Sequence, residues 1–287
     1  MVHAPPPDTF FGITPFQGKI AFVTSDKDLD LASALADAAG SVIRPLFRGD
    51  WADERKADRS PVTEADRAAE AAMRRLIEER FPDDGIIGEE YGTRNEGASR
   101  QWVLDPIDGT VSFMAGRPIF GTLIALMQDG WPVLGVIDQP IARERWIGQI
   151  GEGSTFNGTP VRCRTCPSLQ EAVLATSSPH YFTAEQADPY MRLAAAVGGN
   201  ARQGMIVYGG DCYNYGLVAG GHLDIVCEAG LAIYDYAALV PIIEGAGGTM
   251  SDWQGNPLDA DSAETEDGRV LALGDPARLD DVLEAMG

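Results

Sequence analysis

The chain has 287 residues, 45% of them hydrophobic and 23% charged, a composition typical of globular proteins. We expect no membrane span, because no apolar run reaches about 18 residues, and a cytoplasmic location, because the N-terminus lacks the pattern of a signal peptide. The 22 basic and 43 acidic residues give a net charge of −21, which disfavours contact with nucleic acid since both are negatively charged.

The first half of the chain predicts helices followed by antiparallel strands. Residues 25–47 have helical periodicity, and Ser25 or Asp26 can cap this helix. Residues 60–82 predict a second helix with Thr63 as its N-cap and Asp66 three residues later. Strands are expected within 85–92 and 101–110, on both sides of a turn at 128–130, and within 143–162.

Beyond about residue 165, strands and helices alternate, which is typical of an α/β unit with a mostly parallel sheet. Strands are expected in 171–178, in 269–275 and around a helix within 201–230. Further helices are expected in 187–198, from Tyr234 to Gly247, and in 276–287. Cys163 and Cys166 form an isolated C-x-x-C without a second ligand pair, so we expect loop thiols there.

Carboxylates gather where the strands of the first half end. Glu89 and Glu90 follow one apolar strand, and Asp105 and Asp108 follow the next. Like charges this close destabilise one another unless cations lie between them, and hard ions such as Mg²⁺ prefer oxygen ligands. The pattern therefore indicates a metal site, although a solvated acidic turn is the alternative for Asp105 and Asp108 alone.

The turn after residue 104 has further features of a ligand site. Pro106 restricts the backbone so that the flanking aspartates can converge with the Ile107 carbonyl, and Gly109 allows the backbone to approach a ligand. Thr110 opens a predicted short helix, whose free amides suit a phosphate group. The stretch thus combines metal ligands with a phosphate-binding turn.

These motifs resemble those of the inositol monophosphatase superfamily of metal-dependent phosphatases. The matching pieces occur in the family's order and cover most of the chain: PVTEAD (61–66), IIGEE (86–90), WVLDPIDGT (102–110), AIYDYAAL (232–239) and EGAGG (244–248). The resemblance implies a layered αβαβα sandwich, with an antiparallel sheet in the N-terminal half and a mostly parallel sheet in the C-terminal half. We divide the chain into a loose arm (1–25), an N-terminal α+β metal-binding domain (26–165) and a C-terminal α/β substrate domain (166–287).

The resemblance also implies roles for individual residues. The implied metal ligands are Glu89, Asp105, the Ile107 carbonyl, Asp108 and Asp235. They would hold two or three Mg²⁺ ions, for which Mn²⁺ could substitute.

Catalysis is implied to use a metal-activated water that attacks phosphorus in line. Glu89 would help to orient this water, and Asp66 with Thr110 would activate it. The amides of Gly109 and Thr110 would hold the phosphate. Tyr234 stands where many relatives have tryptophan.

The second half of the chain resembles bacterial histidinol-phosphate phosphatases within this superfamily. The substrate, L-histidinol phosphate, carries an amine and an imidazole, and acidic Asp211 and Glu228 would suit these groups. Asp211 could instead cap a helix, and Glu228 also fits inositol-type members. Tyr208, Tyr213 and Tyr215 could line the pocket, although their spacing more often marks core residues.

We therefore expect an Mg²⁺-dependent phosphomonoesterase of histidine biosynthesis that binds a small phosphorylated metabolite, with no nucleic-acid or membrane partner. Relatives imply a homodimer. The alternatives are an inositol monophosphatase or a broad-specificity sugar or nucleotide phosphatase. A non-catalytic regulatory binding protein on this fold is the alternative of another class.

Overall fold

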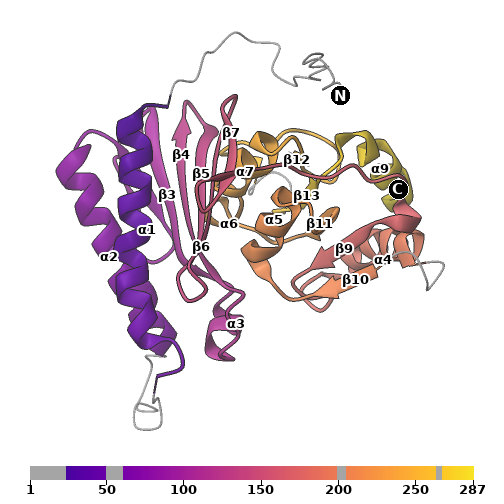
Figure 1. The fold of residues 1–287 in the computed structure, drawn as a ribbon, viewed down its shortest axis with the longest axis horizontal. Helices are drawn as coiled ribbons and strands as arrows, with labels where there is room; N and C mark the ends of the chain where they lie inside the picture. Colours follow the sequence, from indigo (N-terminus) through magenta and orange to yellow (C-terminus); the bar gives the residue numbers. More distant parts are fainter. Residues whose placement is uncertain (1–23, 50–60, 199–204, 263–266) are drawn as a thin grey trace, which may run out of the picture.

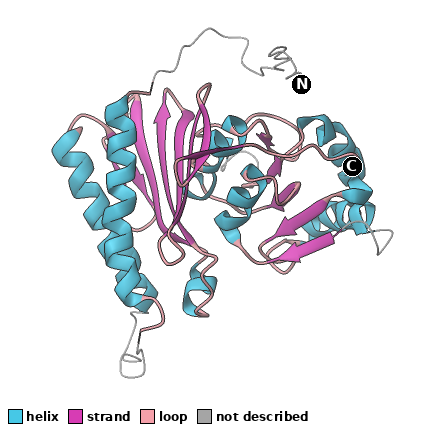
Figure 2. Cartoon of the chain, in the orientation of Figure 1, coloured by secondary structure: helices cyan, strands magenta, loops and turns pink. Residues whose placement is uncertain are grey.

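The computed structural model describes residues 24–49, 61–198, 205–262 and 267–287. Five layers follow one another across the molecule, in the order helices, sheet, helices, sheet, helices (Figures 1 and 2). The αβαβα sandwich is thus confirmed. The expected arm lies almost entirely outside the described residues, and the domain boundary near residue 165 stays a prediction. Within the described ranges, no helix has the length and apolar character needed to cross a bilayer.

Helices α1 (Asp26–Leu46) and α2 (Pro61–Arg80) form the first layer. Ser25 precedes α1 as its N-cap, and its amide donates to the Asp28 carboxylate at 2.8 Å. The prediction that Thr63 caps α2 is wrong, because the helix begins two residues earlier, at Pro61. Proline is favoured in the first helical turn, where its missing N–H removes no hydrogen bond.

The first sheet has eight strands in the order β2-β1-β3-β4-β5-β6-β7-β8. Its pairs are antiparallel except β1 with β3, which agrees with the prediction for this half. Asp129 and Gly130 both have positive φ, 49° and 83°, as the tight turn between β4 and β5 requires. The strands are β1 (Gly85–Gly88), β2 (Gly92–Arg94), β3 (Arg100–Asp108), β4 (Gly121–Gln128), β5 (Trp131–Gln139), β6 (Glu144–Gln149), β7 (Gly153–Phe156) and β8 (Thr159–Val161).

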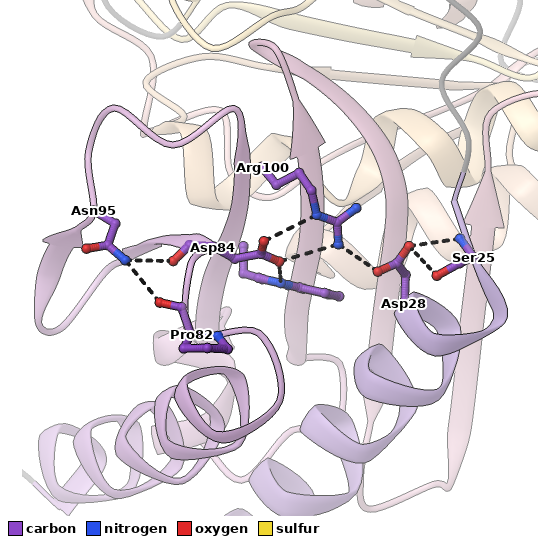
Figure 3. A network of polar contacts seen from close by, with 7 residues as sticks. Ser25, Asp28, Pro82, Asp84, Asn95 and Arg100 are labelled. Atoms are coloured by element: carbon purple, nitrogen blue, oxygen red, sulfur yellow. Dashed lines mark hydrogen bonds and ion pairs between the residues drawn. The ribbon is translucent and has the colours of Figure 1, made fainter.

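A polar network ties this sheet to the helical layer at the start of β3 (Figure 3). Arg100 donates to Asp28 of α1 at 2.7 Å and to Asp84, which precedes β1, at 3.2 Å. The indole N–H of Trp102 donates to the same Asp84 carboxylate at 2.9 Å. These contacts join α1, β1 and β3 at one end, and the parallel pairing of β1 with β3 places the opposite ends of the two strands side by side.

The second sheet has the order β10-β9-β11-β13-β12. It is mixed rather than mostly parallel: β9 pairs in parallel with β10 and β11, whereas β13 pairs antiparallel with β11 and β12. Parallel neighbours need a crossover, such as α4 (Ala184–Gly198) between β9 and β10. The strands are β9 (Val173–Thr176), β10 (Met205–Tyr208), β11 (Ile225–Glu228), β12 (Thr249–Ser251) and β13 (Val270–Leu273).

Helices α5 (Asp211–Ala219), α6 (Ile233–Tyr236) and α7 (Leu239–Gly245) lie between the two sheets, and α9 (Leu279–Met286) packs with α4 outside the second sheet (Figure 1). The single helix expected from Tyr234 to Gly247 is instead the pair α6 and α7. Pro241 explains the interruption, since it cannot donate to the carbonyl of Ala237. A side chain at Gly135 of β5 would collide with the Ala238 backbone, so glycine lets α7 approach the sheet.

Candidate active site

Three carboxylates from two distant segments meet at the end of β3. Oxygen atoms of Asp105, Asp108 and Asp235 all lie within 4.8 Å of one another. Asp105 and Asp108 belong to β3, and Asp235 is brought to them by α6, which packs against that strand. We call these three residues the carboxylate trio.

A local irregularity of β3 presents both of its aspartates. The β3–β4 register shifts between Asp105 and Asp108, which are expected from the sequence to converge here. The Ile107 amide donates to Asp105 at 3.0 Å, and the Cys212 amide donates to Asp108 at 2.6 Å. The Ile107 carbonyl accepts the Thr110 hydroxyl at 3.2 Å. Backbone donors therefore orient both carboxylates.

The negative charge of the trio is not neutralised by neighbouring cationic side chains of the described residues. Burial, and then Asp108 and Glu89, raise the pKa of Asp105 well above its ordinary range, and burial, Asp211 and Asp235 do the same for Asp108. Burial is also the main reason why the pKa of Asp235 rises to about 6. Among the described residues, no arginine or lysine forms an ion pair with the trio. Asp105 is buried, and Asp108 and Asp235 are half-buried. Oxygen ligands in such an environment without a cationic partner fit a hard divalent cation.

Glu89 lies beside the trio rather than within it. It follows β1, and its amide extends the pairing with β3 by donating to the Leu104 carbonyl at 3.2 Å. Burial raises the pKa of Glu89, although a hydrogen bond with Asp105 opposes the rise. Its carboxylate is therefore close enough to share a ligand with Asp105.

Asp66 and Thr110 do not hydrogen-bond each other among the described residues. The Thr110 hydroxyl donates to Ile107, and the buried Oδ1 of Asp66 has no hydrogen-bond partner in the part of the chain that the structure describes. Burial, and then the charges of Glu89, Glu90 and Glu70, raise the pKa of Asp66 to about 8. Asp66 is thus a buried carboxyl group whose raised pKa follows from burial and from neighbouring negative charges.

Gly109 connects β3 to the short helix α3 (Thr110–Met114), as the sequence predicts. Gly109 is the N-cap of α3, with a left-handed φ of 87°. A Cβ at this position would lie 2.7 Å from Oδ2 of Asp211. The turn and the start of α5 therefore face each other closely.

Asp211 and Glu228 line one cavity of about 300 Å³, which Asp108 and Asp235 also line. The Glu228 carboxylate accepts the amide and hydroxyl of Ser177 at 2.7 and 2.8 Å. Burial raises the pKa of Glu228 to about 7. The cavity thus extends from the trio to a second acidic group, and we call it the acidic cavity.

Asp211 does not cap α5. Gly210 is the N-cap, and Asp211 is the first helical residue with an unusual φ of 42°. Its carboxylate accepts the Ser112 hydroxyl at 3.2 Å, so it points across to α3. The alternative of helix capping is therefore wrong.

The three tyrosines of this region have different environments. Tyr215 lines the acidic cavity, and its buried hydroxyl has no hydrogen-bond partner within the described ranges. Tyr213 instead donates to Glu144 at 2.6 Å, and Tyr208 is 52% exposed. Burial raises the pKa of Asp211, and Ser177 and Arg117, which sequence reasoning missed, both oppose this rise. Ser177 follows the end of β9, which is the one signal that could have found it.

Comparisons with known proteins agree with this architecture. The family described as "Inositol monophosphatase family" matches residues 25–277. A chloroplastic bifunctional phosphatase IMPL2 from Arabidopsis thaliana is 47% identical over 271 residues, 91% of this chain and 77% of that protein. A histidinol-phosphatase from Chlorobaculum parvum is 36% identical over 88% of this chain and 98% of its own. A solved inositol monophosphatase from Zymomonas mobilis is 49% identical, with a TM-score of 0.82 over 91% of this chain and 97% of that one.

Proposed function

Since the chain belongs to the inositol monophosphatase family, whose members are phosphoric monoester hydrolases, we propose that it is an Mg²⁺-dependent phosphatase that hydrolyses L-histidinol phosphate to L-histidinol and phosphate. The observation that carries the proposal is the acidic cavity, which joins the carboxylate trio to Glu228 and Asp211. The names of the relatives from Arabidopsis thaliana and Chlorobaculum parvum support a phosphatase of this kind.

The residues suited to hold Mg²⁺ are the trio, Glu89 and the Ile107 carbonyl. When bound, the cations supply positive charge that offsets these carboxylates and polarises the phosphate ester. The amides of Gly109 and Thr110 at the start of α3 orient the phosphate group. Backbone donors already hold Asp105 and Asp108, so little reorganisation is needed when the substrate binds.

Asp66 and Thr110 act on the attacking water. The unpartnered Oδ1 of Asp66 accepts a hydrogen bond from this water and then its proton, which the raised pKa of Asp66 favours. The Thr110 hydroxyl, directed by the Ile107 carbonyl, offers its oxygen as a second acceptor. Together they hold the water on the side of phosphorus opposite the leaving group.

The acidic cavity receives the leaving group. Histidinol carries an amine and an imidazole, both able to bear positive charge near neutral pH. Glu228 and Asp211 attract these groups, and a cation beside Glu228 favours its ionised form. A volume of about 300 Å³ is within the range of small-molecule sites.

Inositol monophosphate is the second candidate substrate. The observation that favours it is the solved Zymomonas mobilis structure, which is named an inositol monophosphatase and covers 91% of this chain. Hydroxyl groups of an inositol ring would also bind to carboxylates, although they gain less from a negative cavity than a cation does.

The test is phosphate release with Mg²⁺ from a panel of histidinol phosphate, inositol 1-phosphate, fructose 1,6-bisphosphate and a nucleotide 3′-phosphate. We expect kcat/KM to favour histidinol phosphate by about 100-fold, which corresponds to about 2.7 kcal/mol in the transition state. A flat profile, or a preference for inositol phosphate, would leave the phosphatase chemistry intact and refute the histidinol assignment.

Mg²⁺ is preferred over other divalent cations because phosphate oxygens and water complete its coordination well. A homodimer and a cytoplasmic location stay predictions.

A further inference from the structure

Glu70, one turn after Asp66 on α2, is fully buried although it carries a charge. Its Oε2 accepts the amide of Glu90 at 2.8 Å, and its Oε1 accepts the amide of Tyr91 at 3.2 Å. Arg74, one further turn along the helix, donates to Oε1 at 2.6 Å. Both oxygens of Glu70 therefore bind the turn between β1 and β2.

Arg74 holds the same turn from the other side. Its guanidinium also donates to the carbonyl of Gly92, the first residue of β2. A Cβ at Gly88, the last residue of β1, would collide with Glu70 and lie 2.7 Å from Arg74. Glycine at this position lets the buried ion pair lie directly against the backbone.

Glu89 is the first residue of this turn. On one side its amide donates to the Leu104 carbonyl, next to Asp105, and on the other side Glu70 holds the two following amides. The turn is therefore fixed between β3 and α2. Since α2 also carries Asp66, this one helix sets the positions of both Asp66 and Glu89.

We propose that the Glu70–Arg74 pair is a positioning device that holds Glu89 at the trio and thereby sets the affinity of the site for divalent cations. The inference rests on the proposed function in taking Glu89 as a metal ligand. A purely structural role would stabilise the turn without affecting cation binding by the folded protein. The two roles differ in whether Glu70 acts through Glu89.

The experiment measures Mn²⁺ binding to the full chain by electron paramagnetic resonance of the free ion, without substrate, together with thermal unfolding of the metal-free protein. For Glu70→Gln we expect the Kd for Mn²⁺ to rise by about 10- to 100-fold, as is usual when a residue supporting a metal ligand is changed. The matched control is Glu78→Gln. Glu78 also lies on α2 and pairs at 3.4 Å with Arg94 of β2, but both side chains are exposed, so the Kd should stay within about twofold.

A double-mutant cycle separates positioning from stability. In a Glu89→Gln background, Glu70→Gln should change the Kd by less than about twofold, because the ligand it positions is already lost. A wild-type Kd in folded Glu70→Gln, or an equal loss in both backgrounds, would overturn the inference. If Glu70→Gln does not fold, Arg74→Lys is the second test. Lysine keeps the positive charge but lacks the forked N–H donors of the guanidinium group, so the Kd for Mn²⁺ should rise by about tenfold. Wild-type protein that binds no Mn²⁺ would instead refute the metal site and thus the proposed function.

Discussion

Replacing Glu228 by glutamine should make the protein more stable and less active. The Glu228 side chain is buried, and burial raises its pKa from an ordinary 4.5 to about 7. Below pH 4.5 the group is neutral in both the folded and unfolded chains. As the pH rises towards 7 the unfolded chain ionises first, so the folded state loses relative stability.

The size of this loss follows from the two pKa values. At about 1.4 kcal/mol per tenfold change in an equilibrium constant, the difference between 4.5 and about 7 corresponds to about 3 kcal/mol above pH 7. Glutamine cannot ionise, and its oxygen can still accept both hydrogen bonds from Ser177. The gain for Glu228→Gln is therefore at most about 3 kcal/mol, or about 6 °C in Tm for a chain of this size.

The assay is thermal unfolding of metal-free protein at pH 4.5 and 8.5. We expect a gain for Glu228→Gln only at pH 8.5. Glu244→Gln is the control. Glu244 lies on α7 and lines a different cavity, and burial raises its pKa to about 7 as well. Glu244→Gln should show the same pH-dependent gain with unchanged hydrolysis. In contrast, Glu228→Gln should lower kcat/KM for histidinol phosphate by about 30-fold, the loss of one charged contact of about 2 kcal/mol.

Two results would refute this reasoning. An equal change in Tm for Glu228→Gln at both pH values would show that ionisation of Glu228 does not destabilise the folded state. Unchanged hydrolysis of histidinol phosphate would show that the charge of Glu228 does not contact the leaving group.

Other predictions concern the trio and Asp211. Asp108→Asn should abolish nearly all phosphate release while the metal-free protein keeps or raises its Tm, because one repelling charge is gone; wild-type turnover at low Mg²⁺ would contradict it. Mg²⁺ binding should release protons, because burial raises the pKa of both Asp105 and Asp108 well above the ordinary range, and calorimetry in two buffers of different ionisation enthalpy measures the number. A binding enthalpy independent of the buffer would exclude this linkage. Asp211→Asn should reduce kcat/KM about tenfold for histidinol phosphate and about twofold for inositol phosphate, and equal losses would remove Asp211 from leaving-group recognition.

Much of the fold follows from local patterns in the sequence. The helical periodicity after Ser25 and the turn at Asp129 and Gly130 depend on near neighbours, and the structure has both where the sequence predicts them. The prediction that the strand ends at Leu104 is wrong, because β3 continues to Asp108. The interruption at Pro241 and the start of α2 at Pro61 were local signals too, but their effect depends on where in a helix a proline falls.

The arrangement of the site depends on contacts between distant segments. The sequence predicts that Asp105 and Asp108 converge because Pro106 lies between them, and the structure has a register shift of β3 at this place. Only the packing of α6 against β3 brings Asp235 to them, and only the two facing layers place Glu228 and Asp211 in one cavity. The buried contact of Glu70 with the turn that carries Glu89 has no sequence signal, because a glutamate on a helix is usually solvated. Local conformational preferences act between neighbouring residues and can be read from the chain, whereas the energy of buried charges depends on what the tertiary structure packs around them.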